Sequence, residues 1–405
     1  MIFKFPPGFL WGSSISSYQT EGLNNASDWF VWEKKQNLEP AGKSTNHYNL
    51  FQSDISLLHS LGQNALRFSI EWSRIYHSKS SVSRYELDHY RDVLYSLREK
   101  GIVPVVTLHH FTNPLWFIER GGWLRPGSVD EFISYVRTIV SYLKDLVQYW
   151  IVFNEPMVYI YNGFIEGVWP PGVKSAKKGL KALDNIVKAY LLAYVEIKRI
   201  YGRDQSYISI AKHMRIFSSC TFHNSIQNNI FAYLRSNFFN FKLINYISNK
   251  QCLDFIGVNY YCREFVRAGK TIFGVECRGN HHRGLRNSLG WFVYPDGLYL
   301  LLMKLKKYNI PVIITENGTS ESTDEAYYRF MYSHIESVAK AIVSGIDVKG
   351  YFWWSLLDNF EWDKGYKHKF GLVEVNFKTF ERNPRKFALE YKKICTNNAI
   401  EVHSL

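Results

Sequence analysis

The sequence lacks the features that would place the chain in a membrane or carry it across one. No segment approaches the roughly eighteen uninterrupted apolar residues of a membrane-spanning helix. Residues 1–7, Met-Ile-Phe-Lys-Phe-Pro-Pro, contain neither the long apolar stretch nor the cleavage site of an export signal. We therefore expect a cytoplasmic protein that has no membrane partner.

Cysteine is scarce. The five cysteines are odd in number, widely spaced and without a Cys-x-x-Cys pair: Cys220, Cys252, Cys262, Cys277 and Cys395. A disulfide framework or a zinc site would normally show paired or clustered cysteines, so we expect reduced thiols and no metal. Two adjacent histidines in the run 280–283, Asn-His-His-Arg, lack a third ligand nearby, and we interpret this run as a polar loop.

Acidic residues are outnumbered, with 36 against 49 basic residues and a net charge of +13. Such an excess raises nucleic acid as a partner. The lysines fall in scattered groups such as the one at 174–181, and no zinc-finger, helix-turn-helix or RNA-binding signature accompanies them. We expect a solvated basic face and no nucleic-acid partner. The sequence leaves open whether the chain forms a homo-oligomer.

The sequence does contain enough apolar material for a large core. Hydrophobic residues make up 46% and charged residues 21% of the chain, as in globular proteins. Aromatic residues make up 17%, which suits both core packing and stacking against sugars. A length of 405 residues fits either several average domains or one barrel, so the pattern along the chain has to decide.

Eight strand-like runs recur along the chain, with amphipathic helical stretches between them. They lie at about residues 8–12, 64–70, 102–109, 149–155, 207–212, 253–260, 311–316 and 347–355. The intervals are too long for hairpins and suit crossover helices. One such helix is predicted over residues 83–100, where Ser83 and Glu86 form a capping box, and Ser128 and Glu131 repeat that signal before the next helix.

No linker, composition break or low-complexity tract separates the eight units. We therefore predict an α/β fold in which residues 1–405 form a single (β/α)₈ TIM barrel. A doubly wound sheet is the structural rival, but it would show a glycine-rich phosphate loop after an early strand. The turn after residue 70 reads Glu-Trp-Ser-Arg instead. In a barrel the active site lies at the carboxyl ends of the strands, so residues that close the strands are the candidates for chemistry.

Two of these strand ends carry glutamates. Glu155 closes the run Ile-Val-Phe-Asn-Glu and Glu316 closes the run Ile-Ile-Thr-Glu, and each is followed by a residue that breaks the strand, Pro156 or Gly318. A pair of carboxyl groups about 5 to 5.5 Å apart is what a retaining glycosidase needs. The other strand ends are also polar or aromatic, which favours an active site over an accidental carboxylate.

The chain resembles glycoside hydrolase family 1, the retaining β-glucosidases and β-galactosidases, across nearly its whole length. The motifs that carry the resemblance are Phe5-Pro6-Pro7-Gly8-Phe9-Leu10-Trp11-Gly12, Ser17-Tyr18-Gln19-Thr20-Glu21-Gly22, Arg67-Phe68-Ser69-Ile70-Glu71-Trp72-Ser73-Arg74-Ile75, Asn154-Glu155-Pro156, Val258-Asn259-Tyr260-Tyr261, Thr315-Glu316-Asn317-Gly318, Trp354-Ser355-Leu356-Leu357-Asp358-Asn359-Phe360-Glu361-Trp362 and Phe370-Gly371-Leu372. Asn-Glu-Pro alone also occurs in related barrel hydrolases. The eight motifs in the same order are far more specific.

The resemblance implies roles for four catalytic residues. Glu316 would be the nucleophile, with Arg67 keeping it ionised and Tyr261 donating a hydrogen bond to it. Glu155 would be the acid/base. Partial burial and the charge of Glu316 would keep Glu155 protonated until Glu316 becomes glycosylated, after which Glu155 could act as a base.

The resemblance also implies a site for the non-reducing sugar and no cofactor. Its candidate residues are Gln19, His110, Phe111, Asn154, Asn259, Trp354, Glu361 and Trp362. Family members that act on 6-phosphoglycosides usually carry a small residue at the position of Glu361, because a carboxylate repels phosphate. Plant thioglucosidases carry glutamine at the position of Glu155. Both features favour neutral O-glycosides.

This chain departs from the family in three places. Phe111 stands where tryptophan is usual, and His213 ends the fifth strand where asparagine is commoner, which leaves the role of His213 open. The loops around 36–46, 202–250 and 263–290 are short, which suggests a shallower cleft for the aglycone.

We expect an exo-acting enzyme that hydrolyses terminal β-D-glucosyl residues, and β-D-galactosyl or β-D-fucosyl residues, of a small β-glycoside or oligosaccharide. A transglycosylating enzyme, a preference for mannose, and a catalytically dead sugar-binding barrel are the alternatives.

Overall fold

The structure, a computed structural model, describes residues 1–203, 205–220, 226–269, 273–277 and 282–402. Eight strands of these residues form a closed parallel barrel. In the order of their pairing they are β9 (Ile256–Arg267), β11 (Val312–Asn317), β12 (Val348–Trp354), β2 (Leu10–Ser14), β3 (Ala65–Ser69), β6 (Val103–His109), β7 (Tyr149–Asn154) and β8 (Tyr207–Ser219). The pairing of β8 with β9 closes the barrel. All eight predicted strands and the TIM-barrel fold are confirmed.

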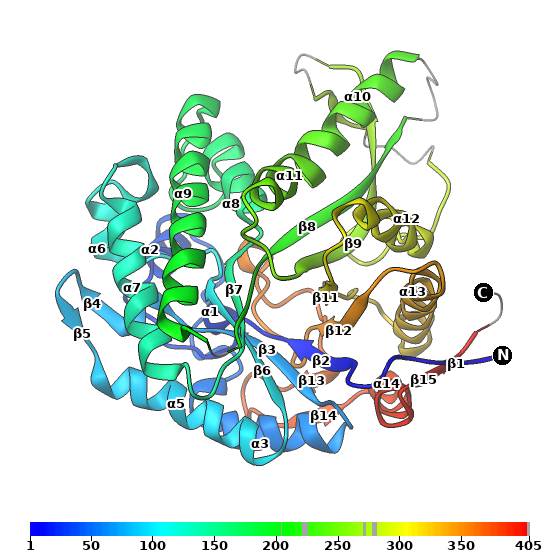
Figure 1. Cartoon of the computed structure of the whole chain (residues 1–405), viewed down its shortest axis with the longest axis horizontal. Helices are drawn as coiled ribbons and strands as arrows, with labels where there is room; N and C mark the ends of the chain where they lie inside the picture. Colours follow the sequence, from blue (N-terminus) through cyan, green and yellow to red (C-terminus); the bar gives the residue numbers. More distant parts are fainter. Residues whose placement is uncertain (204, 221–225, 270–272, 278–281, 403–405) are drawn as a thin grey trace.

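Helices cover the outside of the barrel (Figure 1). They are α1 (Ser17–Thr20), α2 (Asp28–Lys35), α3 (His47–Ser60), α4 (Trp72–Ile75), α5 (Arg84–Glu99), α6 (Leu115–Glu119), α7 (Ser128–Leu143), α8 (Pro156–Ile160), α9 (Ala176–Tyr201), α10 (Ile226–Ser236), α11 (Lys242–Asn249), α12 (Pro295–Leu305), α13 (Asp324–Val343) and α14 (Lys386–Asn397). None of the helices in the described ranges is long and apolar enough to cross a bilayer.

The two predicted capping boxes have different outcomes. Ser83 is the N-cap of α5, and its hydroxyl accepts the backbone N–H of Glu86 at 3.3 Å, as expected. Ser128 instead lies inside α7 as its first residue, and its hydroxyl donates to the carbonyl oxygen of Arg125 at 2.8 Å. The prediction for Ser128 was wrong because its hydroxyl satisfies a carbonyl of the preceding turn rather than an orphan helical N–H.

The barrel interior is filled at one end by one apolar side chain from each of the eight strands or, in one case, from the residue directly before the strand. These side chains are Leu10, Ala65, Val105, Ile151, Ala211, Phe255, Ile313 and Phe352, all buried. Side chains two positions apart on a strand share a face. Arg67 and Thr107, two positions beyond Ala65 and Val105, therefore share the inward face nearer the carboxyl end. The apolar layer closes one end of the barrel interior, and the polar side chains lie nearer the carboxyl ends of the strands.

Two barrel strands are longer than the sequence predicted. The β8 and β9 ladder continues past the barrel from Ile216↔Arg263 to Ser219↔Val266, and the short strand β10 (Val275–Glu276) pairs antiparallel with the end of β9. Figure 1 shows this extension rising from the barrel beside α10. The prediction stopped early because charged residues such as Arg263 and Glu264 end the apolar run there, while the backbone ladder continues.

Small sheets complete the fold. The strands β1 (Ile2–Lys4) and β15 (Ala399–Glu401) pair antiparallel and bring the two ends of the chain together (Figure 1). Two further pairs are β4 (Tyr76–Ser78) with β5 (Ser81–Val82), and β13 (Val373–Val375) with β14 (Arg382–Pro384).

Cys220 and Cys277 form a disulfide, while Cys252, Cys262 and Cys395 are buried free thiols. The expectation of reduced thiols was therefore wrong for this pair. The two cysteines are 57 residues apart in sequence and meet only because the extended β9 lies between them, which spacing along the chain does not reveal.

Candidate active site

Glu155 lies at the junction of β7 and α8. Its backbone adopts the left-handed conformation, with φ 45° and ψ 53°, and its N–H donates to the carbonyl oxygen of Ala211 at 2.8 Å. Left-handed backbone is uncommon for a residue other than glycine and clusters at functional sites. Pro156 then starts the helix at once. The turn holds the carboxyl group of Glu155 at the end of the strand.

Glu316 lies in β11, next to β9 of the closing pair, in a region of irregular register. The register of β11 against β9 shifts between Ile314 and Glu316. Such irregularities are common beside active sites. One carboxylate oxygen of Glu316 forms an ion pair with the guanidinium of Arg67. The other accepts the hydroxyl of Tyr261 at 2.5 Å. All three side chains are buried. Both predicted partners of Glu316 are therefore in contact with it, away from solvent.

Glu155 has a different set of donors. Its Oε1 accepts the side-chain N–H of Asn259 at 2.7 Å and lies 3.0 Å from Nδ1 of His213. Nε of Arg215 donates to the other ring nitrogen of His213 at 2.7 Å. Because Nε2 is the acceptor of that bond, the ring proton of neutral His213 lies on Nδ1 and points at Glu155. Burial lowers the pKa of His213, which agrees with a neutral ring.

Asparagine side chains join the two carboxyl groups into one network. Nη2 of Arg67 donates to Oδ1 of Asn154 at 2.7 Å, and the same oxygen accepts Nδ2 of Asn259 at 3.0 Å. Asn259 is held in turn by the hydroxyl of Thr315 at 2.6 Å. The path from Glu316 through Arg67, Asn154 and Asn259 to Glu155 is therefore continuous. The network fixes both carboxyls relative to each other.

The pKa values of the pair shift in opposite directions. Burial raises the pKa of Glu316, to about 7, with the charge of Glu155 adding to the effect and Arg67 and Tyr261 opposing it. Burial also acts to raise the pKa of Glu155, but His213, Asn259 and Lys212 outweigh it, and the pKa of Glu155 is lowered. The two carboxyl groups therefore titrate as a pair that shares its last proton. The sequence did not reveal the donors around Glu155, and the expectation that Glu155 holds the proton for catalysis stays a prediction.

His110, Trp354 and Glu361 present side chains toward the same region. Nδ2 of Asn154 lies 3.1 Å from Nε2 of His110, whose ring stacks with Trp354 at 5.9 Å between centroids. Burial lowers the pKa of His110, so its neutral ring carries the proton on Nδ1. Among the described residues, neither Nδ1 of His110 nor Oε2 of Glu361 has a hydrogen-bond partner, although both atoms are buried. Such atoms are suited to a polar ligand.

Glu361 is the third carboxyl group of the site. Burial, together with the charges of Asp363, Glu316 and Glu155, raises its pKa to about 8. Glu361 is therefore largely protonated at neutral pH in the free protein.

Three of the predicted sugar-binding side chains are more deeply buried than the sequence suggested: Gln19, Phe111 and Trp362. Nε2 of Gln19 donates to the carbonyl oxygen of Phe360 at 2.8 Å, and its Oε1 accepts the hydroxyl of Ser16 at 2.7 Å. Phe111 is 3% exposed and packs edge-on against Trp362 at 5.4 Å between centroids. Gln19 thus holds the backbone beside Glu361, and Phe111 supports the ring of Trp362.

Sequence reasoning left His213 without a role and missed Lys212 and Arg215. Burial lowers the pKa of Lys212 to about 7, and its Nζ donates to the carbonyl oxygen of His213 at 2.6 Å. Arg215 also forms an ion pair with Glu264 at 2.9 Å. The signal that could have found these residues was their place directly after the apolar run of the fifth strand, as a basic run in an otherwise apolar sheet.

Comparison with known proteins agrees with this geometry. The model of glycosyl hydrolase family 1 matches residues 2–244 and 230–400. The chain is 30% identical to the β-galactosidase of Pyrococcus woesei, over 98% of each protein. The solved structure of a β-glycosidase from Pyrococcus horikoshii superposes with a TM-score of 0.93 at 36% identity, covering 99% of this chain and 97% of that one. A β-glucosidase from Thermotoga maritima, solved in complex with deoxynojirimycin, has a TM-score of 0.93 at 30% identity, over 98% and 100% of the chains.

Proposed function

The chain belongs to glycosyl hydrolase family 1 and is a β-glycosidase, and from that premise we propose that it releases terminal β-linked glucose from small O-glycosides with net retention. β-Galactosides and β-fucosides are proposed as further substrates. The observation that carries the proposal is the network that joins Glu155 at the end of β7 to Glu316 in β11 through Arg67, Asn154 and Asn259. It supports two carboxyl groups with separate sets of partners in one site.

In the first step Glu316 attacks the anomeric carbon of the sugar. Its ionised oxygen forms a covalent bond to that carbon while the bond to the leaving oxygen breaks and Glu155 gives its proton to that oxygen. The ion pair with Arg67 and the hydrogen bond from Tyr261 hold Glu316 in the ionised form and in place for attack.

The step requires the shared proton of the pair on Glu155. Two buried carboxyl groups that share one proton exchange it readily, because only the total count is fixed by pH. A bound glycoside places its leaving oxygen at Glu155 as an acceptor for that proton. Productive binding therefore selects the arrangement in which Glu316 is charged and Glu155 is neutral.

In the second step water releases the sugar. Once Glu316 is an ester its charge is gone, and Glu155, now a carboxylate, takes a proton from the attacking water. The donors around Glu155 suit this step, because hydrogen bonds from Asn259 and His213 stabilise its ionised form. The acid/base is thus built to return to the carboxylate.

The sugar itself would be bound by His110, Asn154, Glu361, Trp354 and Trp362. The two buried atoms without partners among the described residues, Nδ1 of His110 and Oε2 of Glu361, support hydrogen bonding to hydroxyl groups. The ring of Trp354 offers an apolar face beside His110. The related Thermotoga maritima β-glucosidase binds deoxynojirimycin, which supports a glucose-sized ligand. Glu361 disfavours 6-phosphoglycosides by charge repulsion once it is ionised.

Release of nitrophenol from a panel of β-glycosides by the wild type, Glu155→Gln and Glu316→Ala tests the proposal. The wild type should cleave the β-glucoside, and Glu316→Ala should lose on the order of 10⁴-fold or more in kcat. Glu119→Gln, at an exposed glutamate, is the matched control and should behave as wild type. A wild type that cleaves none of the panel, or a fully active Glu316→Ala variant, contradicts the proposal and favours a sugar-binding barrel without activity. Product analysis in the same assay distinguishes hydrolysis from transglycosylation.

A further inference from the structure

A second group of reactive side chains lies on the extension of the barrel, at the outer end of β9. Cys220 directly follows β8, and its backbone N–H donates to the carbonyl oxygen of Val266 at 2.8 Å. Cys277 directly follows β10, and its backbone N–H donates to the carbonyl oxygen of Phe265 at 2.7 Å. The two cysteines are therefore fixed on opposite edges of one strand, at neighbouring residues of it.

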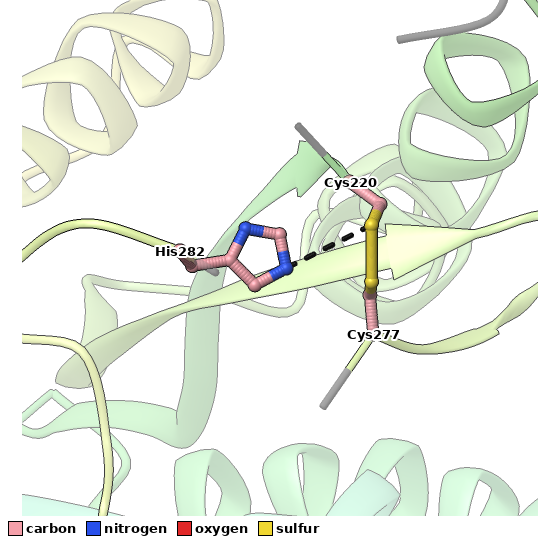
Figure 2. A group of neighbouring side chains, drawn as sticks. All are labelled: Cys220, Cys277 and His282. Carbon is pink, nitrogen blue, oxygen red and sulfur yellow. Dashed lines mark hydrogen bonds between the residues drawn. A yellow bond between two sulfur atoms is a disulfide. The ribbon is translucent and has the colours of Figure 1, made fainter. Parts of the chain in front are cut away.

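His282 completes the group (Figure 2). Its Nε2 lies 3.8 Å from Sγ of Cys220, and the two sulfurs and a ring nitrogen all lie within 4.8 Å of one another. The ring stacks face to face on Phe265, with 3.9 Å between centroids, and meets the edge of Phe292. All three residues are buried, so His282 lies in an irregular segment as the sequence suggested but is not exposed to solvent there. Residues 280 and 281 of that run lie outside the described residues.

Two sulfurs and one imidazole nitrogen form a ligand set that zinc prefers. Zinc binds sulfur at about 2.3 Å and nitrogen at about 2.0–2.1 Å, so tetrahedral ligand atoms lie roughly 3.4 to 3.8 Å apart. The group in this chain falls within a comparable space, and its ligands are anchored through the backbone of β9. Two thiolates also neutralise the charge of the ion, which suits its buried apolar neighbours Phe265 and Phe292.

We propose that Cys220, Cys277 and His282 bind Zn²⁺ when the cysteine pair is reduced, and that the disulfide is the oxidised state of the same site. A dithiol reductant gives two electrons and two protons to the S–S bond and becomes a disulfide itself. The two resulting thiols and the imidazole then bind the ion, and the thiols release their two protons to solvent. The proposal does not depend on the glycosidase mechanism.

The site secures a segment that reaches the catalytic centre. The chain runs from His282 to Trp291, whose ring packs on Tyr261 at 5.8 Å between centroids, and Tyr261 donates to Glu316. The backbone N–H of Arg263 also donates to the carbonyl oxygen of Phe292 at 3.1 Å. The disulfide links the two residues that flank β9, and zinc would in addition link His282 and the segment that follows it, so the barrel extension keeps a crosslink under oxidising and reducing conditions alike.

The experiment measures zinc bound to the whole chain after reduction. Reduced wild type, dialysed without oxygen against limiting zinc, should retain about one zinc ion per chain by elemental mass spectrometry. Cys277→Ser and His282→Gln should bind zinc at least about tenfold more weakly. Cys252→Ser, at a buried thiol whose Sγ contacts the carbonyl oxygen of Lys250, is the matched control and should bind as wild type. Wild type with the disulfide intact should retain none.

Two further readouts keep the test independent of folding defects. Cobalt substituted into reduced wild type should give thiolate-to-metal charge-transfer absorption, which a site of oxygen ligands lacks. Zinc should protect two thiols of the reduced wild type from modification. The proposal is overturned if reduced wild type binds no zinc, if both variants bind it as tightly as wild type, or if cobalt gives no thiolate band.

Discussion

Nδ1 of His213 lies 3.0 Å from Oε1 of Glu155, and Arg215 occupies the other nitrogen of the same ring. The arrangement turns His213 into a donor toward the proposed acid/base, at a position within β8 where related enzymes commonly have asparagine. A donor to the charged form of a carboxyl group lowers its pKa. We therefore expect His213 to act as a positioning residue that influences when Glu155 gives up its proton.

Replacing His213 by asparagine is expected to raise the pKa of Glu155, because the shorter amide does not reach the carboxylate in the same way. The pair then keeps its last proton to higher pH. The basic limb of the kcat/KM profile should move to higher pH, while KM itself should change little. Measurement of the profile on a nitrophenyl β-glucoside checks this, and His59→Gln, at an exposed histidine of α3, is the control. An unchanged or downward-shifted limb contradicts the role assigned to His213.

The wild-type profile itself follows from the raised pKa of Glu316, about 7. Below that pH the pair holds one proton and one charge, which is the active form. As pH rises through about 7 the proton is lost, both carboxyls are charged, and no group protonates the leaving oxygen. We expect kcat/KM to fall above about pH 7. A profile that stays flat well beyond this range would show that the acid keeps its proton by other means.

Removing the hydroxyl of Tyr261 tests the support of the nucleophile. Tyr261→Phe deletes the 2.5 Å hydrogen bond to Glu316 and little else, since the ring still packs on Trp291. A hydrogen bond to a charged group contributes roughly 1.5–3 kcal/mol, so kcat/KM should fall about 10- to 100-fold. Tyr95→Phe, at an exposed tyrosine, serves as the control. Full activity of Tyr261→Phe would exclude the bond from catalysis.

The raised pKa of Glu361 should make the stability of the folded protein depend on pH. Burial raises its folded-state pKa to about 8 from an ordinary value of 4.5. A carboxyl group with a raised folded-state pKa favours the folded state at low pH, and this contribution is lost as pH rises from about 4.5 to about 8. Glu361→Gln removes the ionisation, so its free energy of unfolding relative to wild type should increase with pH across that window. Urea unfolding of both proteins below and above the window measures the difference. A difference that is constant or decreases with pH would contradict the burial of an ionisable Glu361.

The fold was predictable because each barrel strand is an apolar run between helices, and the two glutamates were predictable because a barrel gathers its strand ends. What the sequence did not show depends on contacts between distant segments. The donors that lower the pKa of Glu155 come from β8 and β9, and Cys220 meets Cys277 across the extension of β9. The support that Phe111 gives to Trp362 and Gln19 to the backbone of Phe360 likewise depends on such contacts, and sugar binding by Phe111 and Gln19 stays a prediction. That residues 1–405 form one domain stays a prediction.

The central claim is that Glu316 is the nucleophile and Glu155 the acid/base. Azide tests it most directly, because a small anion can occupy the space of a missing carboxylate. With an activated β-glucoside, Glu316→Ala plus azide should form the α-glucosyl azide by one inversion, whereas Glu155→Ala plus azide should form the β-glucosyl azide by two. Nuclear magnetic resonance of the product distinguishes the two anomers. The β-azide from Glu316→Ala, or exchanged products between the two variants, would contradict the assignment.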